Sequence, residues 1–379
     1  MQSYDFQKIR KEFKKLKCPK GIWAPLHVPF ETCAHNVVMS NRSRGKTTNI
    51  LLFGLLMRKH FDVTSAYIRS TDNEIQPKNL RKLFQTIEEC GYIEKIFPEQ
   101  YNSIKYFGGK YYLTLRDESG EIIAKDDKPF MHLLSIQSAE EYKSTFTDAH
   151  CDFIIFDEFI RKVYRPDEFV DFMDLVETIR RNRETTRVIW LANTIDVFSP
   201  YFRELVIQSQ IETMVEGQSQ IVKVKEGASV YVELLGAQTD DKTKELNKFF
   251  FGFPNRKLQS IVGGGWSMPV YPHCFRDEEK RTLARNIYVN YNENIINLRL
   301  CYTVKNGFFV DCTPANRTYD DSYIYKNGSI TQVNEHYYTG EGNAIDKRIW
   351  HLYRNNRFFY SDNTTGAIIE AFYKESKYY

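Results

Sequence analysis

The sequence lacks the features that mark several classes of protein. Its seven cysteines are odd in number and scattered, and none stands in a CxxC pair, so neither a disulfide framework nor a structural zinc site is indicated. No apolar run reaches the roughly 20 residues that a membrane-spanning helix needs, and the N-terminus has no apolar signal core. The net charge of +3 gives no overall cationic field, so nucleic-acid binding has to use a local basic patch. We expect a protein of the cytoplasm without membrane segments.

The sequence does have the pattern of a large α/β domain. Between His35 and Ala192, short apolar runs alternate with segments long enough for amphipathic helices. The runs are rich in β-branched and aromatic residues, which is typical of buried parallel strands, and they read NVVM, VTSAYI, PFMHLLSI, CDFIIF and RVIWLA. The chain of 379 residues is also long for a single core. We therefore predict an α/β domain with a mainly parallel sheet over residues 1–236.

The character of the sequence changes after Gly236. Residues 237–284 contain the stretch GFPNRKLQSIVGGGWSMPVYPH, which is rich in Gly and Pro and has little periodicity, so we predict a connector there. Residues 285–379 begin with strand-like runs broken by Asn-Gly turns and end with two helix-like segments. This order predicts a second, smaller α/β domain.

The segment SNRSRGKTT, directly after the first apolar run, has the form of a phosphate-binding loop. Such a loop, GxxxxGK[ST], turns its backbone N–H groups, a lysine and a hydroxyl toward the phosphates and Mg²⁺ of a nucleotide. Gly45, Lys46 and Thr47 supply the chemically demanding positions, whereas Ser40 replaces the first glycine, which mainly allows a tight turn. A helix begins after the loop, so its N-terminus would face the phosphates. The predicted ATP-binding residues are Ser40, Asn41, Arg42, Ser43, Arg44, Gly45, Lys46, Thr47 and Thr48.

Two adjacent carboxylates end the apolar run CDFIIF. We predict that Asp157 holds Mg²⁺ together with Thr47, and that Glu158 orients and deprotonates the attacking water. Asn193 follows the next run, RVIWLA, where a polar side chain can contact the γ-phosphate or the water. The alternative interpretation is a solvated pair of carboxylates and a turn-forming asparagine. An additional strand run between the loop and Asp157, combined with the glutamate, indicates the additional-strand, catalytic-glutamate branch of P-loop ATPases.

A basic cluster lies in the segment IRRNRETTR, which contains Arg180, Arg181, Arg183 and Arg187 with the single carboxylate Glu184. The ordinary interpretation is the solvated basic end of a helix, where positive charge complements the helix dipole. The functional interpretation is an arginine that reaches the ATP of a neighbouring subunit and offsets the charge of the transition state. That role requires a ring of subunits.

Three stretches together resemble a known family in order and spacing: FIIFDEFIR, RRNRE and LANTIDVFSPYF. They resemble the DNA-packaging ATPases of small podoviruses whose motor includes a structural packaging RNA, a family that is similar to large terminases. The resemblance implies that Arg181 is a catalytic arginine acting in trans and that Lys143, in EEYKS, contacts a neighbouring subunit. It also implies that Arg42 belongs to the phosphate loop. One departure is the loop RSTDNEIQPKNLRK, which is acidic at Asp72 and Glu74 where the family has a basic DNA-gripping loop.

The resemblance further implies a vestigial ribonuclease-H-like fold for the C-terminal domain. An active nuclease would need three or more clustered carboxylates for two metal ions, and the candidates fall near turns without a clear pattern: Asp311, Asp320, Asp321 and Asp346. The implied partners are double-stranded DNA, the packaging RNA, the portal of a procapsid and a homo-oligomeric ring, a pentamer in the family. The implied location is the host cytoplasm and, transiently, the portal vertex.

Two rival functions stay open on the sequence. One is a terminase whose C-terminal nuclease is active, and the other is a non-catalytic capsid or nucleic-acid scaffold with a decayed phosphate loop. The intact segments Gly45-Lys46-Thr47 and Asp157-Glu158 argue against decay. These segments predict an ATPase that uses ATP and Mg²⁺, and the resemblance implies that it translocates double-stranded DNA into a procapsid.

Overall fold

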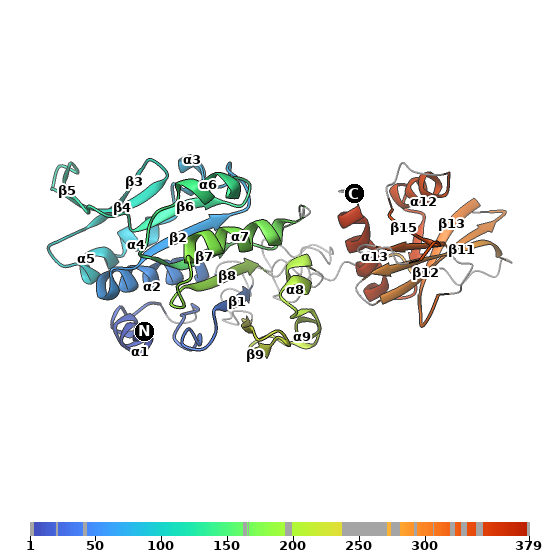
Figure 1. The fold of residues 1–379 in the computed structure, drawn as a ribbon, viewed down its shortest axis with the longest axis horizontal. Helices are drawn as coiled ribbons and strands as arrows, with labels where there is room; N and C mark the ends of the chain where they lie inside the picture. Colours follow the sequence, from blue (N-terminus) through green and yellow to red (C-terminus); the bar gives the residue numbers. More distant parts are fainter. Residues whose placement is uncertain are drawn as a thin grey trace, which may run out of the picture. The chain divides into compact units, whose positions relative to one another are not determined.

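The computed structural model describes most of the chain, in two compact units. The first unit holds strands β1 to β10 and the second holds strands β11 to β16 (Figure 1). The described residues are 4–19, 22–40, 44–161, 165, 167–193, 199–236, 271–273, 281–291, 294–305, 307–318, 323–326, 332–338 and 344–376.

A ten-stranded sheet forms the centre of the first unit. Its order is β3-β4-β6-β2-β7-β8-β1-β10-β9, and β5 pairs with β4. The strands are β1 (His35–Ser40), β2 (Thr64–Arg69), β3 (Ser103–Phe107), β4 (Lys110–Arg116), β5 (Ile122–Lys125), β6 (Met131–Ser135), β7 (Cys151–Asp157), β8 (Arg187–Asn193), β9 (Ser219–Lys223) and β10 (Ser229–Leu234). The six central strands, in the order β6-β2-β7-β8-β1-β10, are all paired in parallel. This arrangement confirms the predicted α/β class with a mainly parallel sheet.

The strands at the two edges of this sheet are antiparallel, which the sequence did not predict. β3, β4 and β5 form an antiparallel group beside β6, and β9 pairs antiparallel with β10. β5 has only four residues, all of them exposed, and its apolar run Ile122-Ile123-Ala124 is shorter than the runs of four to eight residues that indicate a buried strand.

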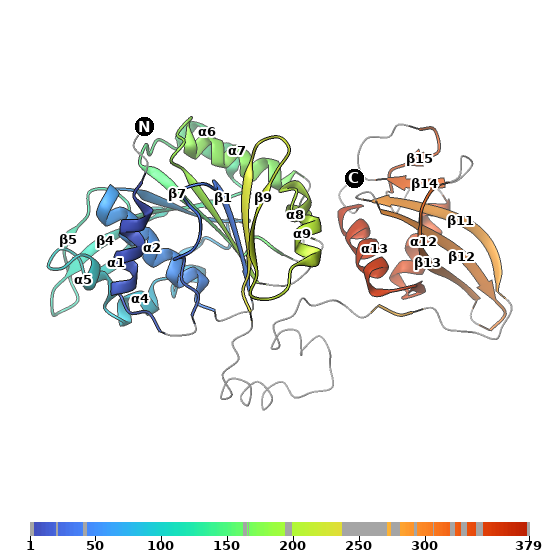
Figure 2. The ribbon, with the colours of Figure 1, turned by 90° about the horizontal axis from the view of Figure 1, so that it is seen from below.

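Helices cover both faces of the sheet (Figure 2). On one face, α2 (Lys46–Phe61) packs against α1 (Phe6–Lys15), α4 (Gln85–Glu89) and α5 (Tyr92–Ile96). On the other face, α6 (Ala139–Thr145) lies beside α7 (Glu168–Arg180). The other described helices before residue 236 are α3 (Pro77–Leu80), α8 (Pro200–Glu204) and α9 (Gln208–Thr213). None of the helices among the described residues is long and apolar enough to span a membrane.

Alternation along the strands builds a separate apolar layer on each face. Phe153 of β7 points toward the α2 side, where the centroid of its ring lies 5.9 Å from that of Phe53. The next aromatic of the same strand, Phe156, stacks on Phe172 of α7 at 4.6 Å. Trp190, which is fully buried, completes this second layer against Phe172. The sheet is therefore fixed between two aromatic layers, and its strand ends become a rigid platform for polar side chains.

The second unit contains a six-stranded sheet of order β15-β14-β11-β12-β13-β16. β11 and β13 both pair antiparallel with β12, whereas β14 runs parallel to β11, β15 to β14 and β16 to β13. α13 contacts four of these strands. The elements are β11 (Thr282–Tyr291), β12 (Asn294–Thr303), β13 (Gly307–Ala315), β14 (Tyr323–Lys326), β15 (Glu335–His336), α12 (Ala344–Arg354), β16 (Phe358–Tyr360) and α13 (Asn363–Glu375). Most of the predicted connector, residues 237–270 and 274–280, lies outside the described residues, and the domain limits stay predictions.

Candidate nucleotide-binding site

A cavity of about 250 Å³ opens at the carboxyl ends of β1, β7 and β8. It brings together three segments that lie far apart in the sequence. Its lining residues are Arg44, Gly45, Lys46, Thr47, Thr48, Asp157, Glu158, Ala192 and Asn193. Of the predicted site residues, Asn41, Arg42 and Ser43 lie outside the described part of the chain.

Gly45 caps the N-terminus of α2 in a conformation that favours glycine. Its backbone is left-handed, with φ 70° and ψ 14°, and its carbonyl accepts from the N–H of Asn49 at 2.9 Å. A Cβ at this position would lie 2.1 Å from Cγ2 of Ile22, so a side chain would also collide with the segment that precedes β1. Trp23 of that segment donates its N–H to the carbonyl of Arg44 at 3.0 Å. The turn into α2 is therefore held by the segment before β1 as well as by the first hydrogen bond of the helix.

Lys46 is buried between the ends of β1 and β8. Its ammonium donates to Oγ of Ser40 and approaches Oδ1 of Asn193 at 3.5 Å. Burial lowers the pKa of Lys46 to about 8, and the charge of Asp157 acts in the opposite direction. A buried ammonium with side-chain oxygens around it and a cavity beside it is a suitable group for binding phosphate.

Ser40 occupies the position of the missing glycine without strain. It is the last residue of β1, paired in register with Asn193 of β8, and its backbone is extended. Since an extended conformation suits any residue, this position needs no glycine.

Thr47 and Asp157 lie together as a magnesium site requires. The hydroxyl of Thr47 donates to Oδ2 of Asp157 at 3.0 Å, and Tyr67 of β2 donates to the same oxygen at 2.8 Å. Burial raises the pKa of Asp157, while Arg69 and these hydroxyl donors lower it. A carboxylate and an alcohol oxygen are hard ligands of the kind that Mg²⁺ prefers, so the residues present fit this ion.

Glu158 follows Asp157 at the edge of the cavity with its carboxylate turned toward Arg69. Its backbone is left-handed, with φ 55°, and its side chain is 52% exposed. Arg69, the last residue of β2, donates to the carboxylate of Glu158 and lies 3.9 Å from Asp157. Arg69 therefore holds the candidate base in an ion pair.

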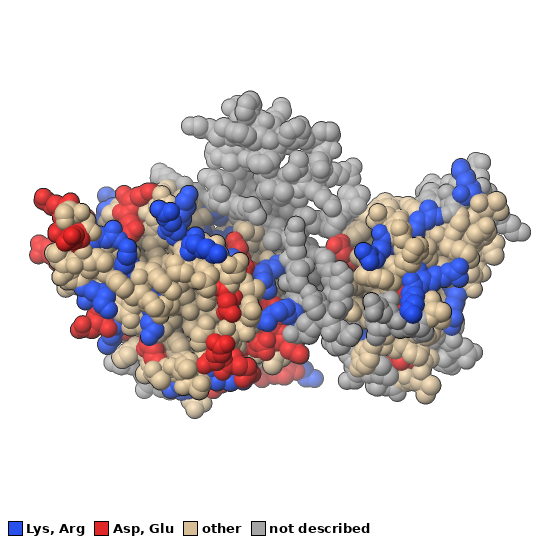
Figure 3. All heavy atoms as spheres, turned by 90° about the horizontal axis from the view of Figure 1, so that it is seen from above, with Lys and Arg blue, Asp and Glu red and all other residues tan. Residues whose placement is uncertain are grey.

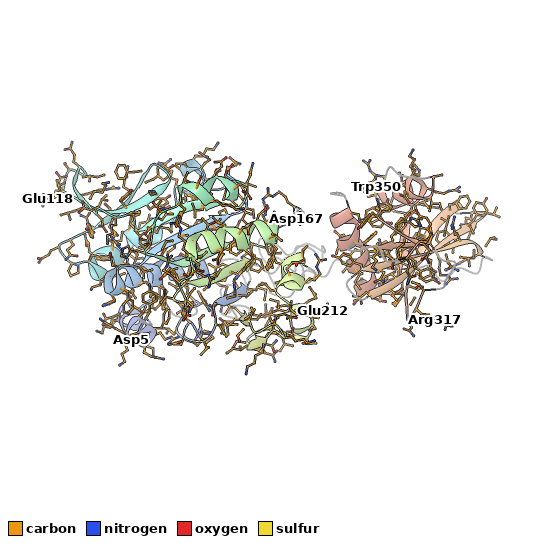
Figure 4. All side chains as sticks on the ribbon, viewed as in Figure 1. Asp5, Glu118, Asp167, Glu212, Arg317 and Trp350 are labelled. Carbon is orange, nitrogen blue, oxygen red and sulfur yellow. The ribbon has the colours of Figure 1, made fainter. Side chains whose placement is uncertain are left out.

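Arg69 and Tyr67 are site residues that the sequence did not predict. Both belong to β2, which lies next to β7 in the sheet, and the run VTSAYIR gives no sign of that neighbourhood. Arg69 also contacts Glu74 at 3.5 Å, and Glu74 lies 3.7 Å from Arg161. Arg161 in turn pairs with the buried Glu168 at 3.0 Å. A chain of ion pairs thus leads from the candidate base to the first residue of α7, whose N-terminal end Asp167 marks in Figure 4.

Arg181 and Lys143 do not line the cavity of their own chain. Arg181 caps the C-terminus of α7 with φ 42°, is exposed, and donates to the carbonyl of Phe146. Lys143 of α6 lies 2.6 Å from Glu140 and 3.3 Å from Asp174 of α7. Both predicted trans residues therefore lie on the α6–α7 pair.

The other arginines of the basic cluster have partners within the unit. Arg183 pairs with the buried Asp152 at 2.7 Å, and Arg180 pairs with Glu177 at 2.9 Å. Arg187 donates to the carbonyl of Phe30. Their contacts are those of structural residues.

Lysines and arginines alternate with acidic residues over the face of the first unit seen in Figure 3. On that face, the described residues form no broad patch of positive or of negative charge. The low net charge is consistent with this mixed surface.

The described carboxylates of the second unit do not form a metal site. Asp311 lies 3.5 Å from Arg281 and 3.6 Å from Arg299, and the buried Asp346 accepts from the hydroxyl of Tyr325 at 2.5 Å. Asp320 and Asp321 lie outside the described residues, and no group of three metal-ligating side chains occurs among those described.

The sequence is similar to viral DNA packaging proteins, and the fold is similar to solved viral packaging motors. The model of the family described as "Podovirus DNA encapsidation protein (Gp16)" matches residues 120–231. The DNA packaging proteins of Bacillus phages PZA and phi29 are each 45% identical over 53 residues, which is 13% of this chain and 16% of each relative. The match therefore spans less than a fifth of these curated relatives.

Two solved structures share the fold over nearly the whole chain. The bacteriophage phi29 genome packaging motor assembly has a TM-score of 0.58 at 16% identity, covering 94% of this chain and 100% of that one. The phi28 gp11 DNA packaging motor has a TM-score of 0.57 at 17% identity, covering 95% and 99%. The predicted resemblance is confirmed, and the range of the family match includes Lys143, Asp157, Glu158, Arg181 and Asn193 but not the phosphate loop.

Proposed function

We propose that this chain, a relative of the podovirus DNA encapsidation proteins, is an ATPase whose hydrolysis drives double-stranded DNA into a viral procapsid. The observation that carries the proposal is the single cavity in which Lys46, Thr47, Asp157, Glu158 and Asn193 meet at three strand ends. The relatives are described as DNA packaging proteins, and the shared fold extends over most of the chain.

The order of the strands supports the additional-strand, catalytic-glutamate class. β8 lies between β1, which leads into the loop, and β7, which ends in Asp157. Asn193 at the end of β8 therefore stands between the phosphate side and the carboxylate side of the cavity.

Each residue has a role that follows from its contacts. The N–H groups at the start of α2 and the Lys46 ammonium bind the phosphates of ATP. Thr47 and Asp157 would hold Mg²⁺, which supplies charge neutralisation on the phosphates. Glu158 accepts the proton of the attacking water once its carboxylate leaves Arg69.

Assembly into a ring completes the proposed catalytic site. Arg181 lies at the exposed end of α7, away from the lining of its own cavity, where it can reach the nucleotide of a neighbouring subunit. Lys143 on the adjoining helix α6 belongs to the same contact. A pentamer is the ring size that the family resemblance suggests.

For the second unit we propose a vestigial ribonuclease-H-like domain that helps to attach the motor to the packaging RNA or the capsid. Support comes from three antiparallel strands, β11 to β13, extended by the parallel strands β14 and β15 on the β11 side. Asp311 and Asp346 are held by arginines and a tyrosine, which speaks against an active nuclease at these positions.

Hydrolysis measured on the full chain tests this proposal. We expect magnesium-dependent ATP hydrolysis that increases with double-stranded DNA and procapsids, and its loss in Lys46→Ala. Nucleotide binding without hydrolysis under all these conditions would favour the rival scaffold, and metal-dependent cutting of the DNA would favour the active terminase.

A further inference from the structure

Ser40 is the residue by which this loop departs from the usual motif, and its side chain has a specific contact. The residue is completely buried, and its hydroxyl accepts a hydrogen bond from the ammonium of Lys46. A glycine in this place could not make that contact.

The contact belongs to a small cluster of side chains at two strand ends. Ser40 and Asn193 are partners in the register between β1 and β8, and the oxygens of both approach the same ammonium. Because the pairing of β1 with β8 places these two residues side by side, their oxygens contact the ammonium from adjacent positions beside the cavity.

The backbone gives no reason for a particular residue at position 40. Ser40 is extended inside β1, so glycine, alanine and threonine all suit the conformation. Whatever Ser40 contributes to the site therefore comes from its hydroxyl.

We propose that Ser40 is a positioning residue for Lys46, whose hydroxyl holds the ammonium in the orientation that meets the phosphates of ATP. The inference rests on the proposed function, namely that this cavity takes a nucleotide. A lysine ammonium sits on a long flexible stem, and a bond that orders it beforehand removes part of the cost of binding.

Four serine variants separate the hydroxyl from other effects. Ser40→Ala and Ser40→Gly remove the hydroxyl, whereas Ser40→Thr keeps it. Ser65→Ala is the matched control, because Ser65 is also completely buried, on the parallel strand β2 of the same sheet, and is not among the residues that line the cavity. A melting curve for each full-length variant verifies that it is folded.

The measurement is a titration of each protein with a fluorescent ATP analogue in the presence of Mg²⁺. We expect Ser40→Ala and Ser40→Gly to weaken binding about tenfold, the range for a hydrogen bond to a charged group. Ser40→Thr and Ser65→Ala should bind like the wild type. Unchanged affinity in Ser40→Ala, tighter binding in it, or an equal loss in folded Ser40→Thr would overturn the positioning role. Absence of binding by the wild type would instead overturn the proposed function.

Discussion

Glu158 carries the proposed chemistry at the scale of single residues. Replacing it with Gln removes the carboxylate that accepts a proton but keeps the size of the side chain. We expect Glu158→Gln to bind ATP like the wild type and to lose hydrolysis by about 100-fold or more, the range for a lost general base. Single-turnover hydrolysis measures the loss, with Glu177→Gln on the exposed side of α7 as a control. Near-normal turnover in Glu158→Gln would assign the base to another group.

Gly45 is the second residue on which the site depends. Gly45→Ala places a Cβ 2.1 Å from Ile22 at a left-handed position, so either the loop or the segment before β1 has to move. We expect a loss of nucleotide affinity of about 100-fold, corresponding to about 2.7 kcal/mol. The control is Gly120→Ala, which has a similar positive φ of 86° but no atom within 4 Å of its Cβ, so that it should keep the affinity. Equal affinities in both variants would show that the turn at Gly45 is not part of the site.

At the scale of elements, the first residue of β1, His35, is a titratable group that packs against β8. The indole N–H of Trp190 in β8 donates to Nδ1 of His35 at 3.2 Å, and burial lowers the pKa of His35 to about 4. Between the ordinary value of 6.5 and 4 the unfolded chain binds this proton and the folded chain does not, so acid favours unfolding.

We therefore expect the free energy of unfolding to fall by up to about 1.4 kcal/mol per pH unit from pH 6.5 to 4 through this group, about 3 kcal/mol in all. Denaturant unfolding followed by tryptophan fluorescence measures this slope. His35→Gln should show a correspondingly smaller slope, and an equal slope in both proteins would contradict this origin.

The elements also explain which parts of the site the sequence could predict. Asp157, Glu158 and Asn193 each follow an apolar run, so the sequence could predict that they lie at the carboxyl ends of parallel strands. Arg69 could not be found this way, because its role depends on β2 lying beside β7, and sheet order is not visible along a chain. Thr47 and Asp157 were predicted to share Mg²⁺, and the structure brings their oxygens within 3.0 Å.

The missed elements have a different physical cause. β3, β4 and β5 lie at the edge of the sheet, where strands are half exposed and the apolar pattern is weak. The long apolar strands of the centre were predicted because both of their faces are buried.

At the scale of the whole molecule, the proposed ring makes Arg181 act on a neighbour's nucleotide. We expect Arg181→Ala to bind ATP normally and to lose stimulated hydrolysis by about 1,000-fold, the range for an arginine finger supplied in trans. Arg180→Ala is the matched control, since Arg180 pairs with Glu177 on its own helix.

Mixing Arg181→Ala with Glu158→Gln tests the direction of this contact. At an interface where the first protein supplies Glu158 and the second supplies Arg181, a complete site is restored, so mixed rings should regain part of the single-turnover hydrolysis. No recovery in rings shown to contain both proteins would leave Arg181 with its structural contact to Phe146 alone.

The most direct test of the proposed function is a packaging reaction with the full chain, the phage's procapsids, the packaging RNA and double-stranded DNA. Nuclease-resistant DNA inside the particles is measured together with phosphate release. We predict that protected DNA increases in proportion to the ATP hydrolysed and that Glu158→Gln protects none. Hydrolysis without protected DNA, or protection by Glu158→Gln equal to that of the wild type, would contradict an ATP-driven packaging motor.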